Sequence, residues 1–240
     1  MALSGAACSG AAMELRDKRI SSTSGHAKPE SYPAAIARKA RVKRTIDLSI
    51  SIAALILLAP LMLLIAILIK IFDPGPIFYS QQRIGLNGRA FKCLKFRSMA
   101  HDADERLADL LENDAAARKL WQERQKLIND PRITPFGRFL RVSSLDELPQ
   151  FINVLRGEMS VVGPRPIVHD EGLRYGRYLA DYCRVKPGLT GMWQVSGRND
   201  TTYQRRIALD VFYSRNWSFA LDLWVMLRTP IAILSREGVY

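Results

Sequence analysis

The sequence has few of the residues that build disulfide frameworks or soft metal sites. Among its 240 residues are only three cysteines, which are scattered and form no CxxC pair. A disulfide framework and a cysteine-based zinc site are therefore not expected, and a reducing cytosolic compartment is the default. The three histidines, His26, His101 and His169, lie far apart and form no HExxH pattern. A histidine-based metal site or catalytic triad is correspondingly disfavoured.

Acidic residues are also in short supply. The chain has 23 Asp and Glu residues against 35 Lys and Arg residues, which gives a formal net charge of +12 and a pI near 9.9. A chain with this balance favours an anionic partner, and nucleic acid, anionic lipid and a phosphorylated substrate all satisfy that requirement. The length fits one domain with an appendage.

Only one long apolar run is present. Residues 48–69 contain no charged side chain, and as a helix this run is about 33 Å long, enough to cross a bilayer. A buried soluble helix of this length is rarely apolar all round. The second apolar stretch, residues 217–234, is broken by Asp222, Arg228 and Pro230. We therefore expect an interfacial segment there, with Asp222 either partnered or facing a site.

Two features argue that the apolar run enters the membrane and returns. Pro60 lies within the run and removes one backbone hydrogen bond, so the helix should bend there. Both flanks are basic, and under the positive-inside rule both favour the cytoplasm. The basic residues are Arg38, Lys39, Arg41, Lys43 and Arg44 upstream and Lys70, Arg83, Arg89, Lys92, Lys95 and Arg97 downstream. A single tilted span with a proline kink remains the alternative.

An adjacent carboxylate pair, Asp146 and Glu147, stands at the predicted start of a short amphipathic helix. The apolar residues that follow recur at i, i+3, i+4 and i+7, and they are Leu148, Phe151, Ile152 and Leu155. A turn over 163–166 then holds one cation, Arg165, on a stiff loop. Carboxylates that face a rigid arginine across a cleft suit a phosphate-containing substrate and a metal ion.

A purely structural interpretation of the pair stays open. Ser144 and Glu147 match a capping box, and acidic residues are favoured in any first helical turn. Pro149 weakens this alternative, because its missing N–H removes a backbone bond within the same helix. As neighbours on a helix, Asp146 and Glu147 should point about 100° apart and perform different tasks. Arg141, just upstream, should keep Asp146 ionised or bind phosphate.

Further cations lie on predicted strands and turns. Two β-prone runs flank a glycine-bearing turn at 85–88, which predicts a β-hairpin. Lys95 and Arg97 share one face of the second run and can hold phosphates there, while a solvated edge guarded by charge is the alternative. Arg198, on a glycine-bearing loop, is another anion-binding candidate.

The fold class that these patterns predict is α+β, mainly helical with a small β-hairpin. Helical patterns cover 101–129, 171–183 and 202–216. We expect a monotopic membrane protein with a proline-bent re-entrant helix and interfacial amphipathic helices. The expected parts are a disordered N-terminal tail over 1–37, a basic flank with the re-entrant membrane helix over 38–72, and a cytoplasmic catalytic domain with interfacial C-terminal helices over 73–240.

Four runs together resemble one family, the bacterial sugar transferases. They read DPGPIFYSQQRIGLNGRAFKCLKFRSM, SSLDELPQFINVLRGEMSVVGPRP, VKPGLTGMWQVSGR and DVFYSRNWSFALDL. The resemblance covers roughly residues 38–234, and four runs in the same order make it specific. Within the family, the chain is most similar to the short monotopic phosphoglycosyl transferases that prime exopolysaccharide assembly with galactose or glucose 1-phosphate.

The resemblance implies a reaction and a set of site residues. The reaction is transfer of a sugar 1-phosphate from a UDP-sugar to polyprenyl (undecaprenyl) phosphate, with release of UMP, a Mg²⁺ requirement and a covalent phosphosugar intermediate. The family's catalytic acids fall on Asp146 and Glu147; the first is the nucleophile, and we assign Glu147 to the metal. Its substrate-binding positions fall on Lys95, Arg97, Arg141, Pro164, Arg165, Pro166, Arg198 and Asp222, and its Pro-Arg-Pro loop is associated with the uridine end.

The resemblance also implies partners and a location. The expected partners are a UDP-sugar, with UDP-galactose or UDP-glucose favoured, polyprenyl phosphate and membrane phospholipid, without nucleic acid. The expected location is the cytoplasmic face of a bacterial inner membrane, and a homodimer stays open. A membrane-tethered basic module that binds lipid or nucleic acid without catalysis is the alternative function. That alternative gives no reason for an ordered carboxylate pair and a Pro-Arg-Pro loop.

Overall fold

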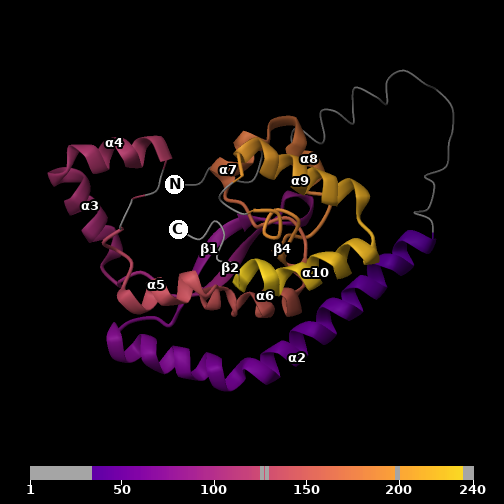
Figure 1. The fold of residues 1–240 in the computed structure, drawn as a ribbon, viewed down its shortest axis with the longest axis horizontal. Helices are drawn as coiled ribbons and strands as arrows, with labels where there is room; N and C mark the ends of the chain where they lie inside the picture. Colours follow the sequence, from indigo (N-terminus) through magenta and orange to yellow (C-terminus); the bar gives the residue numbers. More distant parts are fainter. Residues whose placement is uncertain (1–33, 125–126, 128–129, 198–200, 235–240) are drawn as a thin grey trace. The chain divides into compact units, whose positions relative to one another are not determined.

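The computed structural model describes residues 34–124, 127, 130–197 and 201–234, and Figure 1 shows the order of their elements. Arg198 and residues 1–33 of the expected tail lie outside the described residues. The first described helix, α2 (Ala34–Phe72), begins within the segment expected to be tail. The described part of the chain is mostly helical, as predicted, with one short β-hairpin.

Helix α2 contains the whole apolar run and continues through Pro60. Over Lys39–Phe72 it is long and apolar enough to cross a membrane, by length and composition alone, and little of that segment is buried within the protein. Ile56, Leu57 and Leu63 expose 72%, 79% and 63% of their surface, which is the arrangement a lipid-facing helix requires. The proline-bent re-entrant path remains a prediction.

The described residues divide into two compact units, and two apolar clusters lie in unit 1 while a third lies in unit 2. The described residues of unit 1 fall within Met1–Ile56, Gln81–Cys93 and Gln150–Tyr240, and those of unit 2 fall within Leu57–Ser80 and Leu94–Pro149. Helix α2 and the predicted hairpin, β1 (Phe78–Ile84) with β2 (Ala90–Phe96) around the short helix η1 (Leu86–Gly88), contribute to both units.

Unit 1 is organised around a parallel pair of very short strands, β3 (Ser160–Val162) and β4 (Gly188–Thr190). A Cβ added at Gly163 would clash with the Lys186 carbonyl, so the loop after β3 approaches the β4 segment at a distance that only glycine permits. The helices of this unit are α6 (Gln150–Arg156), α7 (His169–Tyr175), η3 (Gly176–Tyr178), α8 (Leu179–Tyr182), α9 (Tyr203–Asn216) and α10 (Phe219–Leu234).

Unit 2 combines the second half of α2 with short helices. They are α3 (Ala103–Asn113), α4 (Ala115–Arg124), α5 (Pro135–Val142) and the 3₁₀ turn η2 (Leu145–Glu147). Its core is one apolar cluster in which Ile65 and Ile69 of α2 pack with Phe96 and Leu140. Burial of these four side chains provides the stabilisation that fixes α5 and the end of β2, the two segments that precede the site residues.

Two predicted helices are divided in the structure. The pattern over 101–129 forms α3 and α4 within its described part, and Asp114 between them accepts hydrogen bonds from Ala116 N and Ala117 N, which starts a new helix. The pattern over 171–183 forms α7, η3 and α8, because Gly176 adopts a φ of +49° that ends the first helix. Helix α9 confirms the helical pattern predicted over 202–216, and α10 covers most of the second apolar stretch, whose interfacial position stays a prediction.

The prediction that Asp146 and Glu147 open one amphipathic helix is wrong. They lie in the separate turn η2, and α6 begins only at Gln150. Pro149 has no N–H to continue an α-helical ladder, which explains the break. The capping-box alternative is also wrong, because Ser144 has a left-handed φ of +57° and its side chain makes no cap hydrogen bond.

Candidate functional site

The carboxylate pair of unit 2 is held by a single ammonium group. Lys95 Nζ, on β2, lies 3.3 Å from Asp146 Oδ2 and 2.7 Å from Glu147 Oε1. Both carboxylates reach Lys95, although neighbouring side chains point about 100° apart on an α-helix and about 120° apart on a 3₁₀ turn such as η2. Asp146 is 5% exposed. The charges of Asp146 and Glu147 are therefore coupled through Lys95, and the two carboxylates do not behave as independent groups.

Burial controls the protonation of Asp146. Desolvation raises the pKa of its carboxyl above the ordinary value of 3.8, Lys95 is the largest influence in the opposite direction, and the Glu147 charge raises the pKa further. Arg141 also lowers the pKa of Asp146, in the predicted direction, but by less than Lys95. Arg141 donates from Nε to Ser98 Oγ at 2.8 Å, which aligns its guanidinium beside the pair.

Arg97 has different partners from Lys95. It is 8% exposed, donates to the backbone oxygen of Asp73 and lies 3.3 Å from the Asp73 carboxylate. Its guanidinium also packs on Gly75, where an added Cβ would clash with it. Asp73 is shared with His101, whose Nδ1 lies 3.0 Å away. Arg97 thus holds the segment that follows α2, and its predicted contact with substrate phosphate stays a prediction.

The donor set of unit 2 fits a magnesium ion that is bound together with substrate. In the described portion of the chain, no group of three or more His, Cys, Asp or Glu side chains is placed to enclose a metal. Mg²⁺ normally takes one or two carboxylates and completes its shell with water and substrate phosphates. The convergent carboxylates of Asp146 and Glu147 meet that requirement, and Glu147 has the more exposed side chain, at 22% against 7%.

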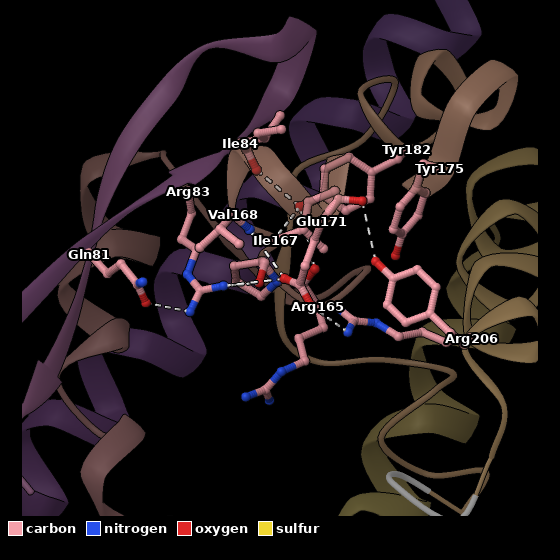
Figure 2. A network of polar contacts seen from close by, with 12 residues as sticks. Gln81, Arg83, Ile84, Arg165, Ile167, Val168, Glu171, Tyr175, Tyr182 and Arg206 are labelled. Carbon is pink, nitrogen blue, oxygen red and sulfur yellow. Dashed lines mark hydrogen bonds and ion pairs between the residues drawn. The ribbon is translucent and has the colours of Figure 1, made fainter. Parts of the chain in front are cut away.

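The Pro-Arg-Pro loop lies in unit 1, within a polar network that Figure 2 shows in close-up. Tyr182 Oη donates to the Ile84 carbonyl at 3.0 Å and accepts from Ile167 N at 3.3 Å, which joins the loop to the end of β1. The guanidinium carbon of Arg165 lies 5.5 Å from the centroid of the Trp193 ring. Pro164 and Pro166 fix φ on both sides of Arg165, so the loop presents this cation in a restricted direction.

Sequence analysis did not identify several residues of this network as site residues. Arg83 donates to the Pro166 carbonyl at 3.2 Å, and Arg206 is 7% exposed and stacks on Trp193 at 4.8 Å. Glu171 lies between the two arginines, 3.5 Å from Arg83 Nη1 and 3.0 Å from Arg206 Nη1. No local motif marks these residues, because each stands in an ordinary strand or helix pattern and meets its partners only in the fold.

A buried acid and tyrosine lie beside Arg206. Asp210 is 1% exposed and accepts a hydrogen bond from Tyr175 Oη at 2.7 Å. Burial raises the pKa of Asp210 to about 6, although the Tyr175 hydrogen bond and the charge of Arg206 oppose the rise. The ionised carboxylate is therefore a source of instability that the surrounding network only partly offsets.

Asp222, expected either to be partnered or to face a site, is fully engaged inside unit 1. Its Oδ2 lies 2.6 Å from Lys43 Nζ and accepts from Trp217 Nε1 at 3.0 Å, while its Oδ1 accepts from Tyr213 Oη at 2.6 Å. These contacts join α10 to the first part of α2 and to α9. They give Asp222 a structural function, and its predicted contact with substrate stays a prediction.

Comparison with known proteins places these residues in a family context. The profile of the bacterial sugar transferase family matches residues 38–236. The exopolysaccharide production protein ExoY of Sinorhizobium fredii is 49% identical over 198 residues, which cover 82% of this chain and 88% of that protein.

Two longer relatives have names that state an activity. The undecaprenyl-phosphate galactose phosphotransferase of Salmonella typhimurium is 49% identical over 83% of this chain and 42% of its own length. The UDP-glucose:undecaprenyl-phosphate glucose-1-phosphate transferase of Escherichia coli is 39% identical over 83% of this chain and 41% of its own length. In both proteins, the matched region is less than half of the molecule.

The raised pKa of Asp210 predicts an effect of pH on stability. The folded-state pKa of about 6 lies above the ordinary 3.8, so folding favours the protonated acid, and the ionised acid costs stability above pH 6. Asp210→Asn should therefore increase the free energy of unfolding at pH 8 by on the order of 2 kcal/mol, and the melting temperature should rise with it. This gain should shrink as the pH falls toward 4. Thermal unfolding in detergent micelles at several pH values measures this.

The matched control is Asp181→Asn. The hydrogen bond from Arg215 lowers the pKa of Asp181, so this substitution should reduce the melting temperature at pH 8. A loss of stability in Asp210→Asn at pH 8 that equals the loss in Asp181→Asn would contradict the prediction.

Proposed function

The chain belongs to the bacterial sugar transferase family, and we propose that it transfers a sugar 1-phosphate from a UDP-sugar to polyprenyl phosphate, with release of UMP. The named activities of the Salmonella and Escherichia relatives support this proposal. Among sugars, UDP-galactose and UDP-glucose are favoured because these relatives transfer galactose and glucose phosphates. Similarity to an exopolysaccharide production protein supports a place at the first membrane step of exopolysaccharide synthesis. Nothing in the comparisons supports the alternative of a non-catalytic binding module.

The observation that carries the proposal is the cluster of three charged side chains formed by Lys95, Asp146 and Glu147. A buried carboxylate with a raised pKa is destabilised as an anion, and it is more nucleophilic than a solvated one. Its attack on a diphosphate requires positive charge nearby to reduce repulsion between anions. Lys95 and Arg141 supply that charge in unit 2.

In the first step, an Asp146 carboxylate oxygen attacks the β-phosphorus of the UDP-sugar. A bond forms between that oxygen and the phosphorus, and the bond from the phosphorus to the bridging oxygen breaks. UMP leaves with the bridging oxygen and the electron pair, while the sugar phosphate remains on Asp146 as an acyl phosphate. Lys95 lies 3.3 Å from the attacking group in the free protein and can follow the developing charge onto the phosphate oxygens.

In the second step, an oxygen of polyprenyl phosphate attacks the same phosphorus. The bond between Asp146 and phosphorus breaks, the carboxylate is restored, and the product is a polyprenyl diphosphate sugar. A lipid acceptor requires the site to lie at headgroup depth, and helix α2 provides an apolar segment long enough to hold it there. This requirement supports attachment at the cytoplasmic face of the bacterial inner membrane, where nucleotide sugars are available.

Glu147 is the proposed magnesium ligand, and Asp146 is reserved for the attack. The bound ion would neutralise phosphate charge in the substrate. Lys95 and Arg141 of unit 2 would orient the diphosphate. For unit 1, taken by itself, we propose that the Pro-Arg-Pro loop binds the uridine end of the nucleotide.

The covalent step predicts a labelled Asp146 peptide. With UDP-sugar and no lipid acceptor, the protein should release about one equivalent of UMP in a burst, and mass spectrometry should find the sugar phosphate on Asp146. Asp146→Asn should lose the burst and reduce turnover by roughly 1,000-fold or more. Asp130→Asn, which removes another buried carboxylate of unit 2, is the control and should keep the label. Rates that fit a ternary complex, with no labelled peptide, would overturn the mechanism.

The metal predicts a defined response to chelation. EDTA should abolish the UMP burst, and Mg²⁺ should restore it. Glu147→Gln should raise the Mg²⁺ concentration needed for half-maximal burst and lower its rate by about 100-fold, while the melting temperature stays near that of the unaltered protein. An undiminished burst in EDTA would exclude a metal requirement.

The re-entrant path predicts that both flanks of α2 stay inside the cell. Cysteines introduced by Lys39→Cys and Lys119→Cys, in a chain that also contains Cys8→Ser, should resist an impermeant maleimide in intact cells and react after lysis. The native Cys93 and Cys183 are buried and should contribute little background. Pro60→Ala should increase labelling of one flank, because a straighter helix favours spanning. Labelling of one flank in intact cells without this substitution would establish a single span.

A further inference from the structure

Glu171 occupies a central position in the polar network of unit 1. It stands in the first turn of α7, directly after the Pro-Arg-Pro loop, and its Oε2 accepts from Val168 N at 3.2 Å. The same carboxylate contacts Arg83 and Arg206, as Figure 2 shows. The Glu171 carboxylate thus binds the backbone N–H of Val168 just after the loop and also orients two guanidinium groups.

The first of these groups reaches the backbone of the loop. Arg83 Nη1 lies 3.5 Å from Glu171 Oε2 and donates to the Pro166 carbonyl at 3.2 Å, while its Nη2 donates to Gln81 Oε1 at 2.7 Å. Burial and then the charge of Arg165 lower the pKa of Arg83, so the two cations lie close enough to repel each other. Glu171 offsets this repulsion and keeps Arg83 beneath the loop.

The second group reaches the side chain of Arg165 through an aromatic ring. Arg206 Nη1 donates to Glu171 Oε1 at 3.0 Å, and its guanidinium carbon lies 4.8 Å from the centroid of Trp193. Arg165 stacks on the same ring at 5.5 Å. Trp193 is 8% exposed, so its ring is closely packed and can shift little unless Arg206 shifts with it. Displacement of Arg206 would shift the surface on which Arg165 rests.

We propose that Glu171 is a positioning residue, which sets the direction of Arg165 toward the nucleotide through Arg83 on the loop backbone and through Arg206 and Trp193 on the side chain. The proposal rests on the proposed function, because it assumes that Arg165 contacts the uridine end of the UDP-sugar. Glu171 itself touches no substrate in this scheme. Its effect is on nucleotide affinity and not on the reaction at Asp146.

The test is a double-mutant cycle between Glu171→Gln and Arg165→Gln, with UMP as the probe. UMP affinity is measured by competition against UDP-sugar, together with kcat, for the full-length protein in detergent micelles. Glu171→Gln keeps the shape of the side chain but loses the charge that holds both arginines. We expect it to weaken UMP binding by about tenfold, as loss of a charge-assisted contact does, with kcat changed by less than about twofold.

The cycle separates positioning from a general structural effect. If Glu171 acts through Arg165, then Glu171→Gln should weaken UMP binding no further in a chain that already has Arg165→Gln. Arg83→Gln, which removes the hydrogen bond to the Pro166 carbonyl, should weaken UMP binding in the same direction by a smaller factor. Glu171→Asp should recover part of the loss, since it restores the charge.

Asp181→Asn is the matched control. Asp181 also joins two arginines of unit 1, Arg184 at 3.3 Å and Arg215 at 2.7 Å, but none of the three contacts the Pro-Arg-Pro loop through a described hydrogen bond or ion pair. Its substitution should leave UMP affinity within about twofold of the unaltered protein, whatever it does to the melting temperature.

The outcomes distinguish the positioning role of Glu171 from the assignment of Arg165 to the nucleotide. Equal, additive losses from Glu171→Gln in both backgrounds, or a loss of kcat without a loss of affinity, would overturn the positioning role. An unchanged UMP affinity in Arg165→Gln would overturn the assignment of Arg165 to the nucleotide, and with it the positioning role, while the UMP burst of the unaltered protein would still support the transferase function. Loss of affinity in Arg165→Gln without any in Glu171→Gln would reject Glu171 alone.

Discussion

Two neighbouring, partly buried carboxylates share one ammonium group, and the chemistry of unit 2 depends on that contact. Without Lys95, the negative charges of Asp146 and Glu147 would repel each other in a medium that solvates them poorly. Burial raises the pKa of Asp146 even with Lys95 present. Ionisation of Asp146 therefore costs free energy in the folded protein, and an ionised carboxylate there would gain from any cation or phosphorus centre that takes its charge.

The backbone around the pair departs from a regular helix. Ser144 is left-handed, Asp146 and Glu147 lie in the 3₁₀ turn η2, and Pro149 prevents this turn from merging with α6. Neighbouring side chains on such a turn point about 120° apart, so Lys95 joins the pair by lying within reach of both carboxylates. A non-glycine residue in the left-handed region is uncommon, and such residues gather at sites where function sets the backbone.

Sequence analysis found what is encoded locally and missed what depends on distant partners. The hairpin, α9 with its Thr202 cap and the apolar run of α2 were predictable, because spacing and capping signals stand within a few residues of one another. The carboxylate pair was identified because it precedes a rigid arginine loop in the sequence, whereas the backbone conformation of the pair was not predicted correctly. Arg83 and Glu171 could not be found in this way: each has an unremarkable neighbourhood, and Arg83 meets the Pro166 carbonyl across 83 positions of sequence.

The basic segment before the apolar run shows how charge counts mislead when burial is unknown. When charges are counted in the sequence alone, Lys43 and Arg44 belong to a cationic flank that would face anionic lipid. In the structure, Lys43 pairs with buried Asp222, and Arg44 donates from both terminal nitrogens to the carbonyls of Val154 and Leu155 at the end of α6. Lys43 therefore neutralises a carboxylate inside unit 1, and Arg44 is engaged by backbone carbonyls there, so both cations offer less to a membrane surface. The upstream flank is therefore a weaker topological signal than its sequence implies. A re-entrant path then depends more on the bend at Pro60 and on the cations that follow α2.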